Sequence, residues 1–344
     1  MMFESISAPR RPNWKLRIVF AVGLLALGAG FVSVWRMTQM PLRSHHGALP
    51  ALSRAQSELA GRLSADVRQL SSAIRERNLQ HEGSLQATTD YLRGELAHAG
   101  YTLTEQTYQI EGEAVSNLEA DLVGSAASDG AVILGAHYDS VDGTVGADDN
   151  ATGVAATLEL ARWLQGSHLR RTVRFVFFVN EEPPYFQSGQ MGSVVYARKL
   201  KRDGVPVSAM ISLETIGYYS DAPGSQKYPP LLNLFYPNRG DFIGFVGNSE
   251  SRDLVRRATR TFRESATFPS EGIAAPANWP GIGWSDQWSF WQEGWPGIMV
   301  TDTAPFRYRY YHTTLDTADK VNFEKMARVT DGLRHVVISL ADER

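Results

Sequence analysis

Acidic and histidine side chains gather at the ends of several apolar segments of this sequence. They directly follow the runs AVILGA, VRFVFFVN and AMISL, or lie in the glycine-bounded segment GADDNATG. The residues are His137, Asp139, Asp148, Asp149, Glu181, Glu182 and Glu214. If the runs are parallel strands, their carboxyl ends meet at one edge of a sheet, and separate loops deliver these side chains to one crevice. Carboxylates held close together repel one another, so such a cluster needs a bound cation.

The composition restricts which cation and which partners are possible. The chain has 344 residues and no cysteine, which excludes disulfides, iron–sulfur clusters, zinc–thiolate sites and cysteine nucleophiles. Any metal must therefore be held by His, Asp and Glu. A net charge of -3, with no basic run interleaved with aromatic residues, gives no reason to expect a nucleic-acid partner. A hydrophobic content of 43% is typical of a packed globular protein.

Each of the candidate residues has an ordinary structural explanation when it is taken alone. A single histidine after a strand is more often a hydrogen-bonded loop residue than a metal ligand. An Asp in a segment such as GADDN is most often a helix cap, and adjacent Glu residues on a surface are usually solvated. The metal-site hypothesis rests on the presence of all these residues together and on their order along the chain.

Short β-branched or aromatic runs alternate with helical stretches along most of the chain. The predicted strands are residues 103–110, 117–123, 131–135, 172–179, 209–213, 242–246 and 297–300. The predicted helices are residues 53–78, 85–99, 152–164, 191–201, 251–265 and 322–340. This alternation predicts a three-layer α/β/α domain with a central mixed, mainly parallel sheet. Runs such as VRFVFFV are apolar on both faces, as expected of central strands covered by helices.

An uncharged apolar segment lies near the N-terminus. Residues 18–35 form a run whose length, at 1.5 Å per residue in a helix, comes near the roughly 30 Å hydrocarbon core of a bilayer. Arg10, Arg11, Lys15 and Arg17 precede it, which by the positive-inside rule places the N-terminus in the cytoplasm. We expect one transmembrane helix that acts as an uncleaved signal anchor. A buried core helix and a cleaved signal peptide are the alternatives.

The expected organisation has four parts. Residues 1–17 are a basic cytoplasmic segment, residues 18–35 the transmembrane signal anchor, and residues 36–52 a polar, proline-broken tether. Residues 53–344 are then one folded domain. With this topology the domain lies outside the cytoplasm, in the periplasm or the extracellular space.

Five segments, in the order in which they occur here, resemble the metal-binding motifs of a known family. They are HYDSV at 137–141, GADDNATG at 146–153, NEE at 180–182, SLETIGY at 212–218 and YHTTLDT at 311–317. The family is the M28 family of zinc exopeptidases, aminopeptidases that use two co-catalytic zinc ions. The resemblance covers roughly residues 55–340. It implies a zinc-exopeptidase-like fold, two Zn²⁺ ions per chain and a peptide substrate.

The resemblance also implies a role for each matching residue. Asp148 is expected to bridge both metals through its two carboxylate oxygens. His137 and Glu214 complete one zinc site, and Glu182 and His312 complete the other. Imidazole and carboxylate ligands suit Zn²⁺.

Two further residues receive catalytic roles from the same resemblance. Glu181 is the expected general base, which takes a proton from the metal-bridging water and delivers it to the leaving amine. Asp139 is expected to accept the second N–H of the His137 imidazole and so to fix its tautomer.

The sequence departs from the better-known members of the family at two positions. Glu214 stands where those members have Asp, although Glu also occurs in the family. Ile282 stands where they have a Tyr that helps to polarise the scissile carbonyl, three residues before the pair Ser285–Asp286. The loops 218–241 and 301–312 are rich in aromatic residues, which suggests an apolar pocket for a substrate side chain.

The leading interpretation is a membrane-anchored zinc exopeptidase, most naturally an aminopeptidase, that hydrolyses peptide bonds outside the cytoplasm. One alternative is a single-zinc acyltransferase similar to glutaminyl cyclases, which share the fold. Another is a non-catalytic ectodomain of the same fold that has lost its metal ligands. Counting the zinc ions bound per chain distinguishes the three interpretations, which require two, one and none.

Overall fold

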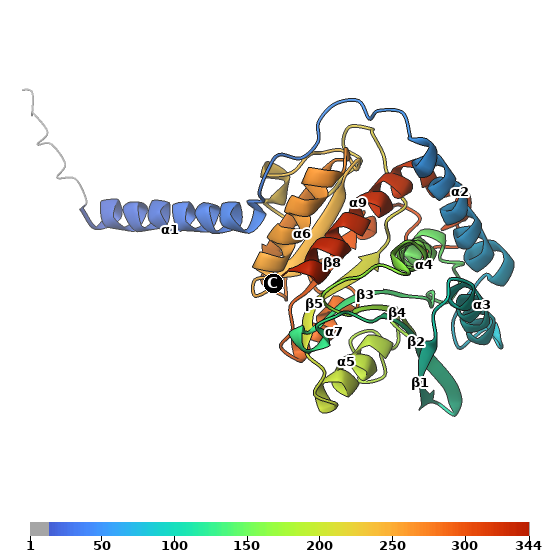
Figure 1. Ribbon diagram of the computed structural model, residues 1–344. Coiled ribbons are helices and arrows are strands. Elements are labelled where there is room, and N and C mark those ends of the chain that lie inside the picture. The colour runs from blue at the N-terminus through green and yellow to red at the C-terminus, as the bar shows by residue number, and fades with distance from the viewer. Residues whose placement is uncertain (1–13, 344) are drawn as a thin grey trace, which may run out of the picture.

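The computed structural model describes residues 14–343, and its centre is a mixed sheet of eight strands with helices on both faces (Figure 1). The strands are β1 (Leu103–Ile110), β2 (Glu113–Leu122), β3 (Ala131–His137), β4 (Val173–Phe178), β5 (Val207–Glu214), β6 (Ile243–Asn248), β7 (Ser270–Ala275) and β8 (Gly297–Thr301). Their order in the sheet is β1-β2-β4-β3-β5-β8-β6-β7. The central strands β4, β3, β5 and β8 are parallel, and so are β6 and β7, whereas β6 runs antiparallel to β8. At the other edge β2 is antiparallel to both β1 and β4.

The described residues form nine helices, most of which cover the two faces of this sheet. They are α1 (Trp14–Thr38), α2 (Arg54–Arg68), α3 (Ser84–His98), α4 (Gly153–Leu164), α5 (Gly192–Arg202), α6 (Arg252–Ser265), α7 (Gln287–Gln292), α8 (Ala304–Arg307) and α9 (Phe323–Asp342). Short helical turns are η1 (Gln69–Ile74), η2 (Ala127–Asp129), η3 (Ala147–Thr152), η4 (Leu232–Leu234) and η5 (Ala318–Lys320). Figure 1 shows α4, α6 and α9 on one face of the sheet and α5 and α7 on the other.

The central strands are apolar on both faces because both faces are covered. In β4, Phe175 and Phe177 belong to the large core beneath α4 and α9. The alternate residues Val176 and Phe178 belong to a second core, which is formed with α5 and α7. Strand residues alternate between faces, so a run such as VRFVFFV supplies both cores at once. The predicted three-layer α/β/α fold is confirmed.

Strand β7 and the short helices α7 and α8 were not predicted from the sequence. Strand β7 has the sequence SEGIAA, which combines small and polar residues with a glycine and lacks the β-branched content of a typical strand. It lies at the edge of the sheet, where only one neighbouring strand has to pair with it. Helix α7 is too short, at six residues, to show a helical repeat of apolar positions.

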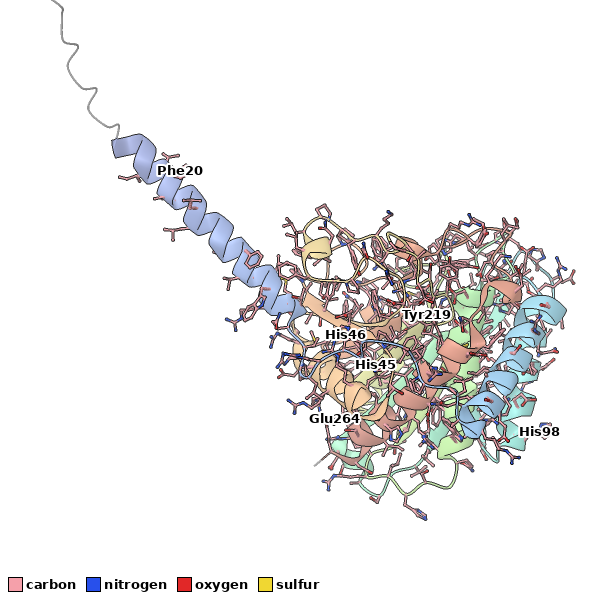
Figure 2. All side chains as sticks on the ribbon, turned by 90° about the horizontal axis from the view of Figure 1, so that it is seen from above. Phe20, His45, His46, His98, Tyr219 and Glu264 are labelled. Atoms are coloured by element: carbon pink, nitrogen blue, oxygen red, sulfur yellow. The ribbon has the colours of Figure 1, made fainter. Side chains whose placement is uncertain are left out.

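Helix α1 contains the apolar segment of residues 18–35. Over Ile18–Thr38 it has a mean hydropathy of 2.3 and is long enough to cross a membrane, and only 6% of that window is buried. It is therefore not a core helix of the domain. Figure 2 shows α1 extending away from the domain, with Phe20 exposed on its surface. Residues 1–13 of the predicted basic segment, which include Arg10 and Arg11, lie outside the described residues.

The segment predicted as a tether, residues 36–52, begins with the last turn of α1 and then lies against the domain. Its backbone carbonyls accept hydrogen bonds from arginine side chains of α6 and α9. Met40 packs directly on Gly272 of β7, where a Cβ atom would come within 2.7 Å of the Met40 side chain. The segment therefore holds the end of α1 close to the edge of the sheet.

Candidate metal centre

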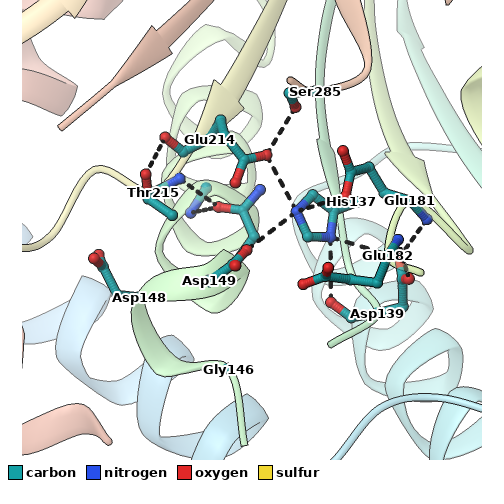
Figure 3. A network of polar contacts seen from close by, with 12 residues as sticks. His137, Asp139, Gly146, Asp148, Asp149, Glu181, Glu182, Glu214, Thr215 and Ser285 are labelled. Carbon is teal, nitrogen blue, oxygen red and sulfur yellow. Dashed lines mark hydrogen bonds and ion pairs between the residues drawn. The ribbon is translucent and has the colours of Figure 1, made fainter. Parts of the chain in front are cut away.

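The carboxyl ends of three neighbouring strands deliver most of the predicted site residues to one place (Figure 3). His137 is the last residue of β3, and Glu214 is the last residue of β5. Glu181 and Glu182 follow β4, which lies on the other side of β3. All four of these side chains are buried, whereas His312, from the loop after α8, closes the site from the solvent side with 30% of its side chain exposed.

Asp149, and not Asp148, lies between the two histidines. Asp149 Oδ1 is 3.4 Å from His137 Nε2, and Asp149 Oδ2 is 3.0 Å from His312 Nε2. Asp148 points away from this cluster, and its Oδ1 accepts a hydrogen bond from the backbone N–H of Gly217 at 2.9 Å. The prediction that Asp148 lies between the two groups of ligands is therefore wrong, and the adjacent residue Asp149 takes that position.

The backbone of the GADDNATG segment explains this correction. Asp149 has extended angles, φ -108° and ψ 92°, and the next residue, Asn150, is also non-helical. In extended chain, consecutive side chains point to opposite sides, so only one of the two aspartates can face the histidines. Asp316 fixes the choice, because its carboxylate accepts hydrogen bonds from the backbone N–H groups of Asp148 at 2.9 Å and of Asp149 at 3.1 Å. Gly146 precedes the turn with φ +54°, and a Cβ atom there would lie 2.2 Å from the Asp149 carbonyl oxygen.

The remaining donors form two groups that share Asp149. His137, Asp149 and Glu214 each offer an atom within 4.8 Å of the others, and so do Asp149, Glu182 and His312. In the first group Glu214 Oε2 lies 3.2 Å from His137 Nε2, and in the second Glu182 Oε2 lies 3.3 Å from His312 Nε2. Each group has one imidazole and one carboxylate of its own in addition to the shared carboxylate.

Asp139 holds the turn that carries the two glutamates. Its Oδ1 and Oδ2 accept hydrogen bonds from the backbone N–H groups of Glu181 and Glu182, both at 3.1 Å. The nearest acceptor to His137 Nδ1 is the backbone oxygen of Asp139 at 3.2 Å, while the carboxylate is 3.5 Å away. The predicted contact with the imidazole is thus made mainly by the backbone of Asp139, and its side chain positions the glutamate pair.

Several positioning residues were missed in the sequence. Arg77 is fully buried and donates to the backbone oxygens of Tyr138 and Gly146, at 2.7 and 2.9 Å. Ser285 donates to Glu214 Oε2 at 2.7 Å and so orients that carboxylate. Ser285 lies in a segment that the sequence singled out, as does Asp316 in YHTTLDT. Arg77 lies 60 positions before His137, in a segment without any chemical signal.

The charges of the site are unbalanced in the absence of a metal. Burial raises the pKa of Glu182 to about 7, with a further contribution from the charge of Asp149, and it raises the pKa of Glu181 well above its usual value. Burial works against protonation of His312, but hydrogen bonds to Asp149 and Glu182 outweigh it and raise the pKa of His312 to about 10. The metal-free cluster thus takes up protons to offset its carboxylates, and a bound metal has to displace them.

The donor set fits zinc. His137 Nε2, both oxygens of Asp149 and Glu182 Oε1 are buried without a hydrogen-bond partner among the described residues. Buried polar atoms without partners are costly, and coordination would satisfy all four. Two imidazoles and three carboxylates are hard or borderline donors of the kind that Zn²⁺ accepts.

A pocket opens beside the cluster, next to Glu214 and Tyr311. As expected from the aromatic loops, Tyr228, Tyr236 and Phe306 line it, and Ile282 lies in its wall. Arg307 is buried and donates to the backbone oxygens of Gly240 and Phe242 at 3.1 and 2.9 Å. It holds the wall of the pocket.

Known proteins share the sequence pattern of this chain. The profile of Peptidase family M28 matches residues 117–337. Uncharacterized protein YfbL of Escherichia coli is 40% identical over 295 residues, which cover 83% of this chain and 89% of that protein. Probable aminopeptidase YDR415C of Saccharomyces cerevisiae is 27% identical over 237 residues and 64% of this chain. The match spans 55% of the yeast protein, so this chain covers about half of that relative's length.

Solved structures share the fold. The zinc aminopeptidase BSAP from Bacillus subtilis has a TM-score of 0.65 at 13% identity, with 83% of this chain and 95% of that chain covered. The glutaminyl cyclase of Tannerella forsythia has a TM-score of 0.60 at 21% identity, with 83% and 99% covered. At these identities the similarity shows a common fold, and it does not distinguish between the two activities.

Proposed function

The chain belongs to peptidase family M28, and from this premise we propose that it is a membrane-anchored, two-zinc aminopeptidase that acts outside the cytoplasm. Family membership makes the protein a metallo-exopeptidase, which is a hydrolase. The number of metal ions, the residue roles, the aminopeptidase specificity and the membrane topology are the parts that we propose.

One observation carries the two-metal proposal: the two oxygens of Asp149 face one histidine each. We assign His137, Asp149 and Glu214 to one zinc ion, and Asp149, Glu182 and His312 to the other. The three carboxylates supply three negative charges against the four positive charges of two Zn²⁺ ions, which leaves the loaded centre positive. When bound, the ions would act as Lewis acids and would lower the pKa of a coordinated water.

Glu181 is the proposed general base. Its Oε2 lies 3.9 Å from His137 Nε2, and it also offers an oxygen within 4.8 Å of His137 and Glu182. It does not belong to either of the two groups that share Asp149. The hydrogen bond from its backbone N–H to Asp139 fixes its position. Burial raises its pKa, so the carboxyl group can take up a proton from the attacking water and return it to the leaving amine.

The proposal is tested by metal analysis and by hydrolysis of aminoacyl coumarin amides. We expect about two zinc ions per chain and release of the N-terminal residue, with activity lost after chelation and restored by zinc. One zinc ion per chain together with cyclisation of N-terminal glutamine would instead indicate a glutaminyl-cyclase-like enzyme. Absence of both zinc and activity would indicate a non-catalytic domain.

The membrane proposal rests on α1, which is apolar and exposed over a length that can span a bilayer. If residues 18–35 cross the membrane with the basic flank inside, a reporter fused after Arg344 should be active only outside the cytoplasm. Carbonate or high-salt washing should leave the protein in the membrane fraction.

The same experiment separates an anchor from a cleaved signal peptide. A cleaved protein would appear in the soluble fraction with a new N-terminus close to residue 38. A reporter that is active in the cytoplasm would contradict the proposed topology.

A further inference from the structure

The pocket beside the metal centre is longer than a short apolar side chain needs. It starts at Glu214 on β5, passes over Met299 on β8 and Val246 on β6, and reaches Glu271 and Ile273 on β7. These strands are neighbours in that order. With a strand spacing of about 4.8 Å, three steps across the sheet correspond to about 14 Å. A side chain that enters next to the metals can therefore extend across the sheet towards its edge.

The walls of this pocket are apolar and aromatic. Trp284 and Phe306 stack with their ring centroids 6.0 Å apart, and Tyr228 and Tyr236 stack at 5.6 Å. The hydroxyl groups of both tyrosines already donate to backbone oxygens, at 2.6 and 2.7 Å. These walls suit an aliphatic stem or a flat cationic group.

Among the polar residues of the wall, Gln226 is engaged within the protein, because it donates to Thr303 at 3.0 Å and accepts from Arg307 at 2.7 Å. Glu271 differs from Gln226, because none of the described residues donates a hydrogen bond to its side chain. Its nearest cation is Nη2 of Arg263, at 3.7 Å.

Arg263 is committed to other partners. Its guanidinium donates to the side chain and backbone oxygens of Ser270 and to the backbone oxygens of Pro41 and Leu42. Glu271 therefore keeps unused acceptor capacity, although its side chain is only 22% exposed. Burial raises the pKa of Glu271 to about 7, which reflects the cost of a carboxylate in this environment. A cationic ligand would remove that cost.

We propose that Glu271 receives the cationic end of the substrate's N-terminal side chain, so that the enzyme prefers N-terminal arginine and lysine. This inference rests on the proposed aminopeptidase function and names the substrate class of that site. Arginine and lysine combine a long apolar stem, which matches the aromatic walls, with a charged end that matches Glu271. A leucine side chain would leave the Glu271 end of the pocket unfilled.

The test compares aminoacyl coumarin amides of arginine, lysine, norleucine and leucine on the zinc-loaded, detergent-solubilised full chain. The wild type should have a higher kcat/KM for arginine and lysine than for norleucine. Glu271→Gln keeps the shape but removes the charge, and it should lower the arginine-to-norleucine ratio by about 10- to 100-fold, as expected for a hydrogen bond to a charged group.

Asp241→Asn is the matched control. Asp241 is an acidic residue whose charge reaches Glu271, but it does not line the pocket. Its replacement makes the same charge change outside the pocket and should lower the ratio much less than Glu271→Gln does. Zinc content and melting temperature of each variant show whether it folds. An unchanged ratio in Glu271→Gln, or a wild type that prefers norleucine over arginine, would overturn the proposal.

A second measurement separates this proposal from the proposed function. If the wild type hydrolyses none of the amides, the aminopeptidase assignment fails, and binding of free L-arginine and L-norleucine is then measured by calorimetry. Tighter binding of L-arginine that is lost in Glu271→Gln would still support the pocket assignment. Equal binding of the two amino acids would overturn it.

Discussion

Asp149→Ala is expected to remove both zinc ions and to abolish hydrolysis, because among the described residues Asp149 has one oxygen 3.4 Å from His137 and the other 3.0 Å from His312. Loss of residues that only support a ligand typically costs 10- to 100-fold in metal affinity or activity, so loss of a shared ligand should cost more than about 100-fold. His137→Ala or His312→Ala should mainly weaken one ion. Zinc per chain by mass spectrometry and the rate of hydrolysis are the two measurements.

The neighbouring residue provides the matched control. Asp148 accepts a hydrogen bond from Gly217 and faces away from the histidines, so Asp148→Asn should keep about two zinc ions. Two zinc ions and full activity in Asp149→Ala would refute the assignment. A folded Asp148→Asn variant without zinc would return the bridging role to Asp148.

Glu181→Gln is expected to lower kcat by 10²- to 10⁴-fold, the usual contribution of general acid–base catalysis. The substitution preserves the shape and leaves both proposed groups of ligands intact. Zinc content and KM should therefore change little, because the substrate meets the same pocket and the same metals. Steady-state kinetics together with zinc analysis separate these quantities.

Glu182→Gln serves as the comparison within the same turn. It removes a charged ligand from one ion, so zinc affinity and activity should fall together, and excess zinc should partly restore both. If both variants lose zinc to the same extent, or if Glu181→Gln keeps the wild-type kcat, the proposed division of roles between the two glutamates is wrong.

Much of the fold could be predicted from the sequence because its central strands are buried on both faces. Runs such as VRFVFFV and AVILGA have an unmistakable apolar character, and the helices between them show regular apolar spacing. The edge strand β7 had no such signal, since an edge strand can be short, small and partly polar. Because β7 was not predicted, Glu271 on this strand was not recognised as a pocket residue.

Most of the predicted site residues lie at the end of a strand or within a few residues after it. His137 and Glu214 are fixed by the strands they terminate, and residues at the carboxyl ends of neighbouring parallel strands must converge. The choice between Asp148 and Asp149 had no such constraint, because both lie in one irregular turn. Sequence spacing cannot tell which of two adjacent side chains faces inwards when a single backbone rotation exchanges them.

The type of chemistry and the edge of the sheet where it is expected follow from the sequence alone. Because the chain has no cysteine, a metal has to be held by carboxylate oxygens and imidazole nitrogens, and the pattern of buried strands indicates where these side chains meet. Which aspartate the histidines share, and which distant groups hold that aspartate in place, depends on the tertiary structure. Asp316 accepts hydrogen bonds from the backbone of that turn from 167 positions away, and Arg77 donates to the backbone oxygen of Gly146, the residue before the turn. Such contacts depend on how loops pack, and loop packing leaves no periodic pattern in a single sequence.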